Sequence, residues 1–228
     1  MKKKKIVVAI LPALNLENGI KDIVLRTKKY VDFAIVVSDG STDNTRKNAL
    51  EVGAKCPIQK NIRGMGNAIR KGIEFSKQFL PNIIVLIDAD GQHLPEEIPH
   101  LINPILFQNY DFIIGSRMMG ELKTSFINKI GNFGLKLITF VLLKKWFSDS
   151  ETGFRAYKAE KLYSLKLISN GYEIETDILF RSMKRGYTFK EVPIFVPKAV
   201  RGVKITDGFK MGFFKIKLYL KLRKCDSY

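Results

Sequence analysis

The first half of the chain alternates short apolar runs with amphipathic stretches. The apolar runs predict strands over residues 6–11, 33–37, 83–87 and 111–114. Helical spacing of apolar residues, with Pro95 at a helix start, predicts helices over 18–30, 43–52, 66–79 and 95–108. Strands that are apolar throughout and alternate with helices form parallel sheets covered on both faces. The pattern therefore predicts an α/β domain with a doubly wound, mostly parallel central sheet.

The second half of the chain has a different pattern. Apolar residues recur at helical spacing from Phe126 to Val141, and the segment closes with Lys144-Lys145-Trp146. This predicts an amphipathic helix over about 126–145, whose basic, aromatic end suits a membrane interface. A helix that packs on a sheet carries the same apolar stripe, so both interpretations stay open.

The C-terminal segment is ambiguous from its pattern. Between Phe209 and Lys224 apolar and basic residues alternate, which favours a strand, yet four lysines fall on one helical face: Lys210, Lys217, Lys221 and Lys224. We expect a basic amphipathic helix at a membrane interface. The chain is accordingly divided into a domain over 1–207 and a basic C-terminal segment over 208–228.

Composition narrows the choice of partners. Lys and Arg number 39 against 22 Asp and Glu, a formal net charge of +17. Such a charge favours an anionic partner, whether nucleic acid, a phosphosugar or an acidic membrane surface, without choosing among them. The only cysteines, Cys56 and Cys225, provide neither a disulfide framework nor a zinc-ligand spacing, which fits a reducing cytoplasm.

The N-terminus and the apolar runs bear on membrane insertion. Lys2 to Lys5 followed by an apolar stretch resembles a secretory signal, but Pro12, Asn15 and Glu17 interrupt it, so we expect the first core strand. No run approaches the roughly 18–20 apolar residues that span a bilayer. Any membrane contact is therefore expected to be peripheral.

Polar loops follow three of the predicted strands, at 12–17, 38–43 and 88–93. In open α/β sheets ligands bind beyond the carboxyl ends of the strands. Asp88-Ala89-Asp90 follows a buried strand, and its carboxylates could hold a hard divalent cation, or could simply form a polar turn. Three polar loops at one edge favour a site. Asp39 could accept hydrogen bonds from a nucleobase or ribose, whereas capping is the expected role of Asp43.

Glycine and arginine motifs lie near the same edge. The turn from Arg63 to Ala68 opens a helix and could bring backbone amides close to a base or phosphate, but Ile69 breaks the dinucleotide fingerprint. Arg117, in Gly115-Ser116-Arg117, could clamp a phosphate or form a surface salt bridge. No P-loop motif occurs in the sequence.

Further polar clusters follow in the second half. The dense run from Asp149 to Tyr157 predicts a second substrate pocket, and the acids of 171–177 are read as dipole partners at a helix start. Arg201 precedes the basic segment and suits an anionic head group. His93 is a candidate ligand or base whose commoner role is a loop hydrogen bond, and His100 is expected on a helix surface.

Taken together and in order, these motifs resemble GT-A glycosyltransferases of family 2, in the branch of dolichyl- and polyprenyl-phosphate sugar synthases similar to dolichol-phosphate mannose synthase. The resemblance covers roughly residues 5–205. The motifs that carry it are Pro12-Ala13-x-Asn15, Ser38-Asp39-Gly40-Ser41-Thr42-Asp43, Gly64-x-Gly66, Asp88-Ala89-Asp90-Gly91-Gln92-His93, Gly115-Ser116-Arg117 and Thr152-Gly153-Phe154-Arg155-Ala156-Tyr157. It implies a Rossmann-like GT-A domain with amphipathic interfacial helices in its C-terminal half.

The resemblance also implies an activity and a site. The activity is inverting, metal-dependent transfer of a hexose from GDP-mannose, UDP-glucose or UDP-N-acetylglucosamine to dolichyl or polyprenyl phosphate, at the cytoplasmic face of a membrane and with no nucleic acid partner. The implied nucleotide-binding residues are Pro12, Ala13, Asn15, Glu17, Asp39, Gly64, Asp88 and Ala89. The implied ligands of Mg²⁺ or Mn²⁺ are Asp88, Asp90 and Gln92. Arg117, Arg155 and Arg201 would bind the acceptor phosphate, and Asp90, Arg117 and Asp149 would be catalytic.

Departures from the family pattern leave alternatives open. Leu14 stands where the family often has an aromatic residue and Ser38 where it often has an aspartate, so the nucleotide stays undetermined. The alternatives are a family 2 enzyme with another acceptor, or a basic nucleic-acid- or membrane-binding module without catalysis. A phosphatase of the haloacid dehalogenase type is disfavoured, because its D-x-D-G motif normally follows the first strand.

Overall fold

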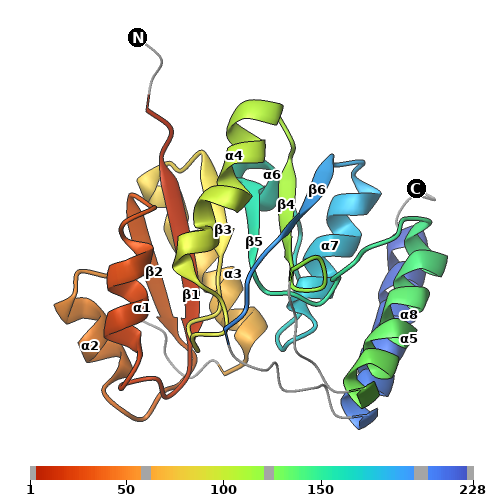
Figure 1. Cartoon of the computed structure of the whole chain (residues 1–228), viewed down its shortest axis with the longest axis horizontal. Coiled ribbons are helices and arrows are strands. Elements are labelled where there is room, and N and C mark those ends of the chain that lie inside the picture. The colour runs from red at the N-terminus through yellow and green to blue at the C-terminus, as the bar shows by residue number, and fades with distance from the viewer. Residues whose placement is uncertain (1–3, 58–62, 121–125, 198–204, 225–228) are drawn as a thin grey trace.

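The computed structural model describes residues 4–57, 63–120, 126–197 and 205–224. Its centre is a six-stranded sheet in the order β2-β1-β3-β5-β4-β6, in which β5 alone runs antiparallel to its neighbours (Figure 1). The strands are β1 (Val7–Ala13), β2 (Phe33–Ser38), β3 (Ile83–Leu86), β4 (Phe112–Ser116), β5 (Arg155–Lys158) and β6 (Phe189–Pro193). The predicted α/β class and the mostly parallel sheet are confirmed.

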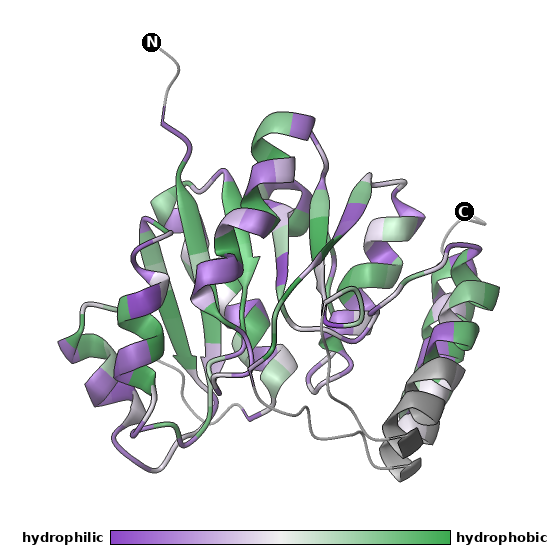
Figure 2. Ribbon diagram, viewed as in Figure 1, coloured by the Kyte–Doolittle hydropathy of each residue, from purple (hydrophilic) through white to green (hydrophobic). Residues whose placement is uncertain are grey.

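Helices cover both faces of this sheet. They are α1 (Ile20–Thr27), α2 (Thr45–Glu51), α3 (Met65–Ser76), α4 (Ile98–Gln108), α5 (Phe126–Leu143), α6 (Ala159–Tyr163), α7 (Ile174–Lys184) and α8 (Ile205–Lys224), with 3-10 turns η1 (Lys77–Phe79) and η2 (Pro95–Glu97). Side chains alternate across β1, so Ala9 and Leu11 pack toward α1 and α4 while Val8 and Ile10 pack toward α3. Figure 2 shows the apolar strands between amphipathic helices.

Every strand and helix predicted in the first half is present with small differences at its ends. The strands β5 and β6 and the short helix α6 were not predicted. β5 has Arg155 at one end and Lys158 at the other, and β6 is a half-exposed edge strand that ends in Pro193, so neither has the continuous apolar run by which the other strands were found.

The C-terminal segment is helical, as expected. α8 runs beside α5 at one side of the molecule and in the same direction (Figure 1). Leu218 and Leu222 of α8 are buried against the domain, and the predicted boundary between residues 207 and 208 falls inside this helix. Among the described residues, no helix combines the length and the apolar character that crossing a bilayer requires.

Candidate active site

A cavity of about 700 Å³ lies at the carboxyl ends of β1, β2 and β3. The three polar loops at 12–17, 38–43 and 88–93 and residues of the second half of the chain line it together. Its lining comprises Pro12, Ala13, Leu14, Leu16, Asp39, Met65, Asp88, Ala89, Asp90, Gln92, Leu135, Glu151, Gly153, Tyr172, Glu175 and Met211. Another cavity, of about 660 Å³, lies between α7 and the ends of α5 and α8, but no carboxylate lines it. The acidic cavity is the candidate site.

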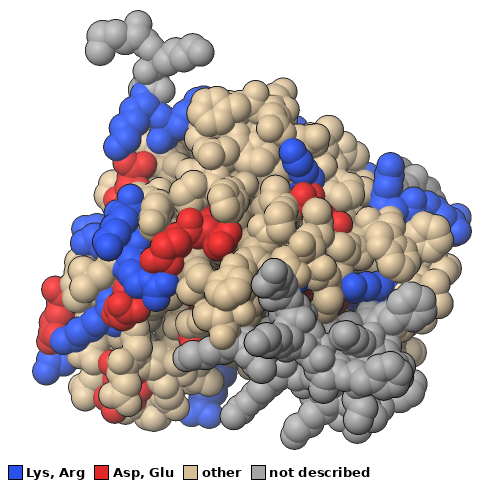
Figure 3. Space-filling model, viewed as in Figure 1, with Lys and Arg blue, Asp and Glu red and all other residues tan. Residues whose placement is uncertain are grey.

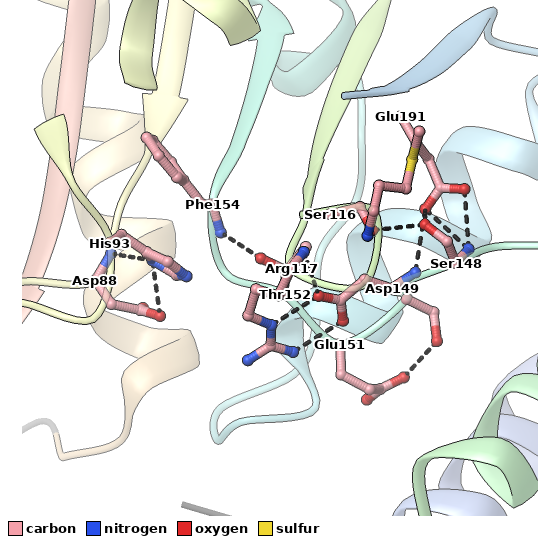
Figure 4. Close-up of polar contacts among 12 residues, drawn as sticks. Asp88, His93, Ser116, Arg117, Ser148, Asp149, Glu151, Thr152, Phe154 and Glu191 are labelled. Atoms are coloured by element: carbon pink, nitrogen blue, oxygen red, sulfur yellow. Dashed lines mark hydrogen bonds and ion pairs between the residues drawn. The ribbon is translucent and has the colours of Figure 1, made fainter. Parts of the chain in front are cut away.

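The loop after β3 is held by its own side chains. The backbone N–H of Asp88 donates to Nδ1 of His93 at 3.3 Å, and the His93 ring stacks on Phe154 (Figure 4). Burial lowers the pKa of His93, so the neutral imidazole can accept this hydrogen bond. His93 therefore has the loop-holding role that the sequence favoured. His100 lies on the surface of α4 beside Glu97, as expected.

Asp88 and Asp90 present oxygens suited to a divalent cation. Gln92 donates to the Asp90 carboxylate from its backbone N–H at 2.9 Å and from its side-chain amide nitrogen at 2.8 Å, and its amide oxygen takes no part in these bonds. Opposite them, a Cβ added to Gly153 would lie 2.8 Å from both carboxylate oxygens of Asp88. Glycine at this position thus makes room for Asp88. The donor set of two carboxylates and one amide oxygen fits Mg²⁺ or Mn²⁺.

Asp39 lies in the cavity wall and is fixed by Gly64. The Gly64 N–H donates to Oδ1 of Asp39 at 2.6 Å; burial raises the pKa of Asp39, although this hydrogen bond opposes the shift. Gly64 has a φ of 115°, and a Cβ on it would lie 2.3 Å from the carbonyl oxygen of Asn170. Gly64 is not among the residues that line the cavity, and its connection to the cavity is through Asp39.

Asn15 and Glu17 support the second loop from outside the cavity. The Asn15 side chain accepts from the backbone N–H of Thr42 at 3.0 Å, and Glu17 accepts from that of Asn44 at 3.1 Å. Asp43 accepts from both the N–H and the hydroxyl of Thr45, which agrees with its expected capping role. Asn15 and Glu17 thus hold the loop over 38–43 without lining the cavity, and their predicted contact with the nucleotide stays a prediction.

Arg117 and Asp149 form a pair, and the catalytic role predicted for Asp149 stays a prediction. Nε and Nη2 of Arg117 donate to the two oxygens of Asp149 at 2.7 and 2.8 Å (Figure 4). Burial would raise the pKa of Asp149, but Arg117 outweighs it and holds this pKa below the ordinary value. Asp149 is buried, so its role is to orient Arg117, whose Nη1 takes no part in the pair.

Arg155 is a structural residue, which corrects its predicted contact with an acceptor phosphate. Its guanidinium is fully buried and donates to the carbonyl oxygens of Thr152, Glu175 and Ser150 at 2.7–2.9 Å. These bonds fasten the loop over 148–154, named here the central loop, to α7. The loop was predicted to form a second pocket, but Glu151 and Gly153 line the same cavity as Asp88. Arg201 lies outside the described residues, so its contact stays a prediction.

Glu175 is a site residue that sequence reasoning missed. It lines the cavity with only 4% of its surface exposed, and neither carboxylate oxygen has a hydrogen-bond partner among the described residues. Burial raises the pKa of Glu175 to about 7; Arg155, 3.6 Å away, opposes this shift, and Asp88 and Glu151 add to it. Its place near a helix start suggested only a dipole partner, and nothing in the local pattern marks it as buried.

The sheet order and the acidic loops define an α/β transferase fold of the GT-A class, and solved structures agree. Glucosyl-3-phosphoglycerate synthase from Mycobacterium tuberculosis superposes with a TM-score of 0.74 at 22% identity, over 96% of this chain and 80% of that one. The same enzyme in complex with Mn²⁺, uridine diphosphate and glucosyl-3-phosphoglycerate gives a TM-score of 0.73.

Sequence comparisons identify the family. Residues 8–166 match the model of glycosyl transferase family 2. A UDP-N-acetylglucosamine–dolichyl-phosphate N-acetylglucosaminyltransferase of Methanococcus voltae is 33% identical over 96% of this chain and 98% of its own length. An uncharacterised protein of Methanocaldococcus jannaschii is 37% identical over 90% of this chain and 88% of its own. This chain belongs to glycosyl transferase family 2, and it is a glycosyltransferase.

Proposed function

We propose that this protein transfers a sugar from a nucleotide sugar, first of all UDP-N-acetylglucosamine, to dolichyl or polyprenyl phosphate at a membrane surface. The observation that carries the proposal is a single cavity in which Asp39, Asp88 and Asp90 meet Leu135 of α5 and Met211 of α8. Transfer from a polar nucleotide sugar to a lipid acceptor requires a site that contacts both substrates. The name of the Methanococcus voltae relative supports both substrates.

Asp88, Asp90 and Gln92 would hold a Mg²⁺ or Mn²⁺ ion in this proposal. When bound, the ion would neutralise the charge that develops on the leaving nucleoside diphosphate. The hard oxygen donors found at these positions support the assignment, as does the complex of the Mycobacterium tuberculosis relative with Mn²⁺ and uridine diphosphate.

Arg117 would bring the acceptor phosphate to the sugar. The phosphate is already ionised at neutral pH, so it can attack the anomeric carbon without a strong general base. An in-line displacement of the nucleoside diphosphate inverts the configuration at that carbon. Because Asp149 holds two nitrogens of the Arg117 fork, the third can face the phosphate in a fixed orientation, which lowers the repulsion between two anionic substrates.

The α5–α8 helix pair would lie in the membrane interface. Its outer side exposes six large apolar side chains, and Trp146, which follows α5, adds a seventh; each has 42–71% of its surface accessible: Leu137, Phe140, Val141, Trp146, Phe213, Ile216 and Leu220. Exposed basic residues accompany them, including Lys144, Lys145 and Arg223 at the ends of the two helices. Figure 3 shows basic side chains gathered at this side of the molecule. Apolar side chains in the acyl boundary with basic ones at the head groups suit an anionic cytoplasmic leaflet.

The activity is tested with purified protein, Mn²⁺ and polyprenyl phosphate in detergent, offering radiolabelled UDP-N-acetylglucosamine, UDP-glucose and GDP-mannose in turn. We expect label from one donor to move into the organic phase, and Asp90→Ala to abolish this transfer at an unchanged melting temperature. Transfer only to a water-soluble acceptor such as 3-phosphoglycerate would instead assign another acceptor. Full turnover by Asp90→Ala would refute the site.

Membrane contact is tested separately by flotation with vesicles that contain an anionic lipid. The double variant Phe213→Ser/Leu220→Ser removes two apolar groups from the outer side of α8. We expect at least a tenfold weaker partition, because burying each side chain contributes roughly 1.5–3 kcal/mol. Phe107→Ser, which removes an apolar side chain from α4 that is more exposed than either of these, is the matched control and should bind as the wild type does.

A further inference from the structure

Lys215 of α8 is a fully buried lysine that points into the domain. Its Nζ donates to Oε1 of Glu151 at 2.6 Å and to the hydroxyl of Thr139 at 2.7 Å, and it lies 3.3 Å from the carbonyl oxygen of Leu135. Lysines are almost never fully buried unless they are paired. The proposed membrane contact involves the outer side of α8 and so leaves this inward cation unexplained.

The partner of Lys215 lies in the wall of the cavity. Glu151 belongs to the central loop, between Asp149, which orients Arg117, and Gly153, which makes room for Asp88 (Figure 4). Oε1 of Glu151 accepts from both Lys215 and the Ser150 hydroxyl. Burial would raise the pKa of Glu151, but Lys215 outweighs it and keeps this pKa below its ordinary value. An ionised carboxylate is therefore presented to the cavity in a fixed orientation.

The charge of Glu151 determines which part of a donor it can accept. A carboxylate repels the diphosphate and the acceptor phosphate, both of which are anionic. The sugar is neutral and rich in hydroxyl groups, and an N-acetyl sugar adds an amide N–H, so it supplies the hydrogen-bond donors that a carboxylate needs. Glu175 lines the same cavity, and its oxygens have no hydrogen-bond partners among the described residues.

We propose that Glu151 binds a hydroxyl or amide group of the donor sugar and that Lys215 is the positioning residue that orients it. The inference rests on the proposed function and adds a consequence: the sugar subsite is assembled from the central loop and the C-terminal helix together. Docking of α8 on α5 is then a condition for binding the sugar, besides any role in membrane contact.

The test compares the binding of UDP with that of UDP-N-acetylglucosamine by calorimetry in the presence of Mn²⁺, without any acceptor. Glu151→Gln and Lys215→Met should each weaken UDP-N-acetylglucosamine about tenfold and change UDP less than twofold, since a hydrogen bond to a charged group contributes about that much. The double variant should bind the nucleotide sugar no more weakly than the weaker single variant, because both changes disable one contact.

Lys158→Met is the matched control. Lys158 pairs with Asp111 at 3.0 Å at the opposite edge of the sheet, so its loss lowers stability without touching the cavity. If Lys215→Met fails to fold, the result for Glu151→Gln tests the inference by itself. This variant is expected to fold, because glutamine has the same shape as glutamate and position 151 is partly exposed. Equal losses for UDP and UDP-N-acetylglucosamine, or no loss, would overturn the inference while the proposed function stands. A wild type that binds neither nucleotide would overturn both.

Discussion

The acids of the first half of the chain are held differently from those of the second half. Asp39 is fixed by a backbone N–H, Asp88 lies beside a neutral histidine, and Asp90 is fixed by an amide. In the second half Asp149, Glu151 and Glu175 lie beside Arg117, Lys215 and Arg155. Neutral hydrogen-bond donors do not offset the negative charge of the first set, so this charge is available to bind a cation. Each acid of the second set has a cationic partner, which suits the orientation of Arg117 and the proposed binding of an uncharged sugar.

This difference is tested most strongly at Arg155. Arg155→Met would leave the Glu175 carboxylate and three carbonyl oxygens buried without their cation. We expect the free energy of unfolding to fall by about 3–5 kcal/mol, measured by urea denaturation. Arg26→Met breaks the two surface pairs with Glu96 and Asp22 and should lower this free energy by about 1 kcal/mol or less. Normal stability with a selective loss of acceptor affinity would restore Arg155 as a phosphate ligand.

The Arg117–Asp149 pair is expected to matter for the acceptor alone. Arg117→Lys keeps the charge but loses the planar fork that holds both oxygens of Asp149. We expect kcat/KM for polyprenyl phosphate to fall about a hundredfold while the dissociation constant of the donor is unchanged. Asp149→Asn should have a similar effect through Arg117. An unchanged kcat/KM would leave the pair without a role in transfer.

Glu175 predicts a dependence of stability on pH. Its pKa rises from the ordinary 4.5 to about 7 on folding, so between these values the folded protein binds more protons than the unfolded chain. The contribution of Glu175 to stability therefore falls as pH rises through this window. Glu175→Gln removes that contribution, and its stability relative to the wild type should improve from pH 5 to pH 8 by on the order of 2 kcal/mol.

Denaturation of both proteins at the two pH values measures this change, because the titration of groups that do not interact with Glu175 cancels in the difference. A constant difference between the two proteins would mean that Glu175 titrates as an ordinary exposed carboxylate.

The smallest expected effect concerns the space beside Asp88. Gly153→Ala would place a methyl group 2.8 Å from both Asp88 oxygens and displace them. We expect the Mn²⁺ concentration for half-maximal activity to rise about tenfold with little loss of stability, because a short carboxylate can move. Gly134→Ala in α5 meets no atom within 4 Å and should raise stability by up to about 1 kcal/mol. Unchanged Mn²⁺ dependence in Gly153→Ala would argue against Asp88 as a ligand.

The first half of the fold could be predicted because its signals are local. Runs such as Ile83 to Leu86 are apolar on both faces, and each is followed directly by the polar loop that lines the cavity. β5 could not be predicted, because its short Arg-Ala-Tyr-Lys sequence is buried only by insertion between β3 and β4. Asn15, Glu17 and Gly64 were predicted to bind the nucleotide, and that contact stays a prediction; in the structure they support the loops and Asp39 from outside the cavity.

The sequence by itself determined the parallel α/β core and the acidic edge of the sheet, since periodicity and strand-end chemistry are properties of neighbouring residues. Only the tertiary structure decided which charges face each other. Lys215 and Glu151 are 64 positions apart, and Arg155 and Glu175 are 20 apart. The local sequence pattern does not show whether a basic side chain is buried or exposed, so only packing made Arg155 a structural residue. Packing also placed α8 in the wall of the site.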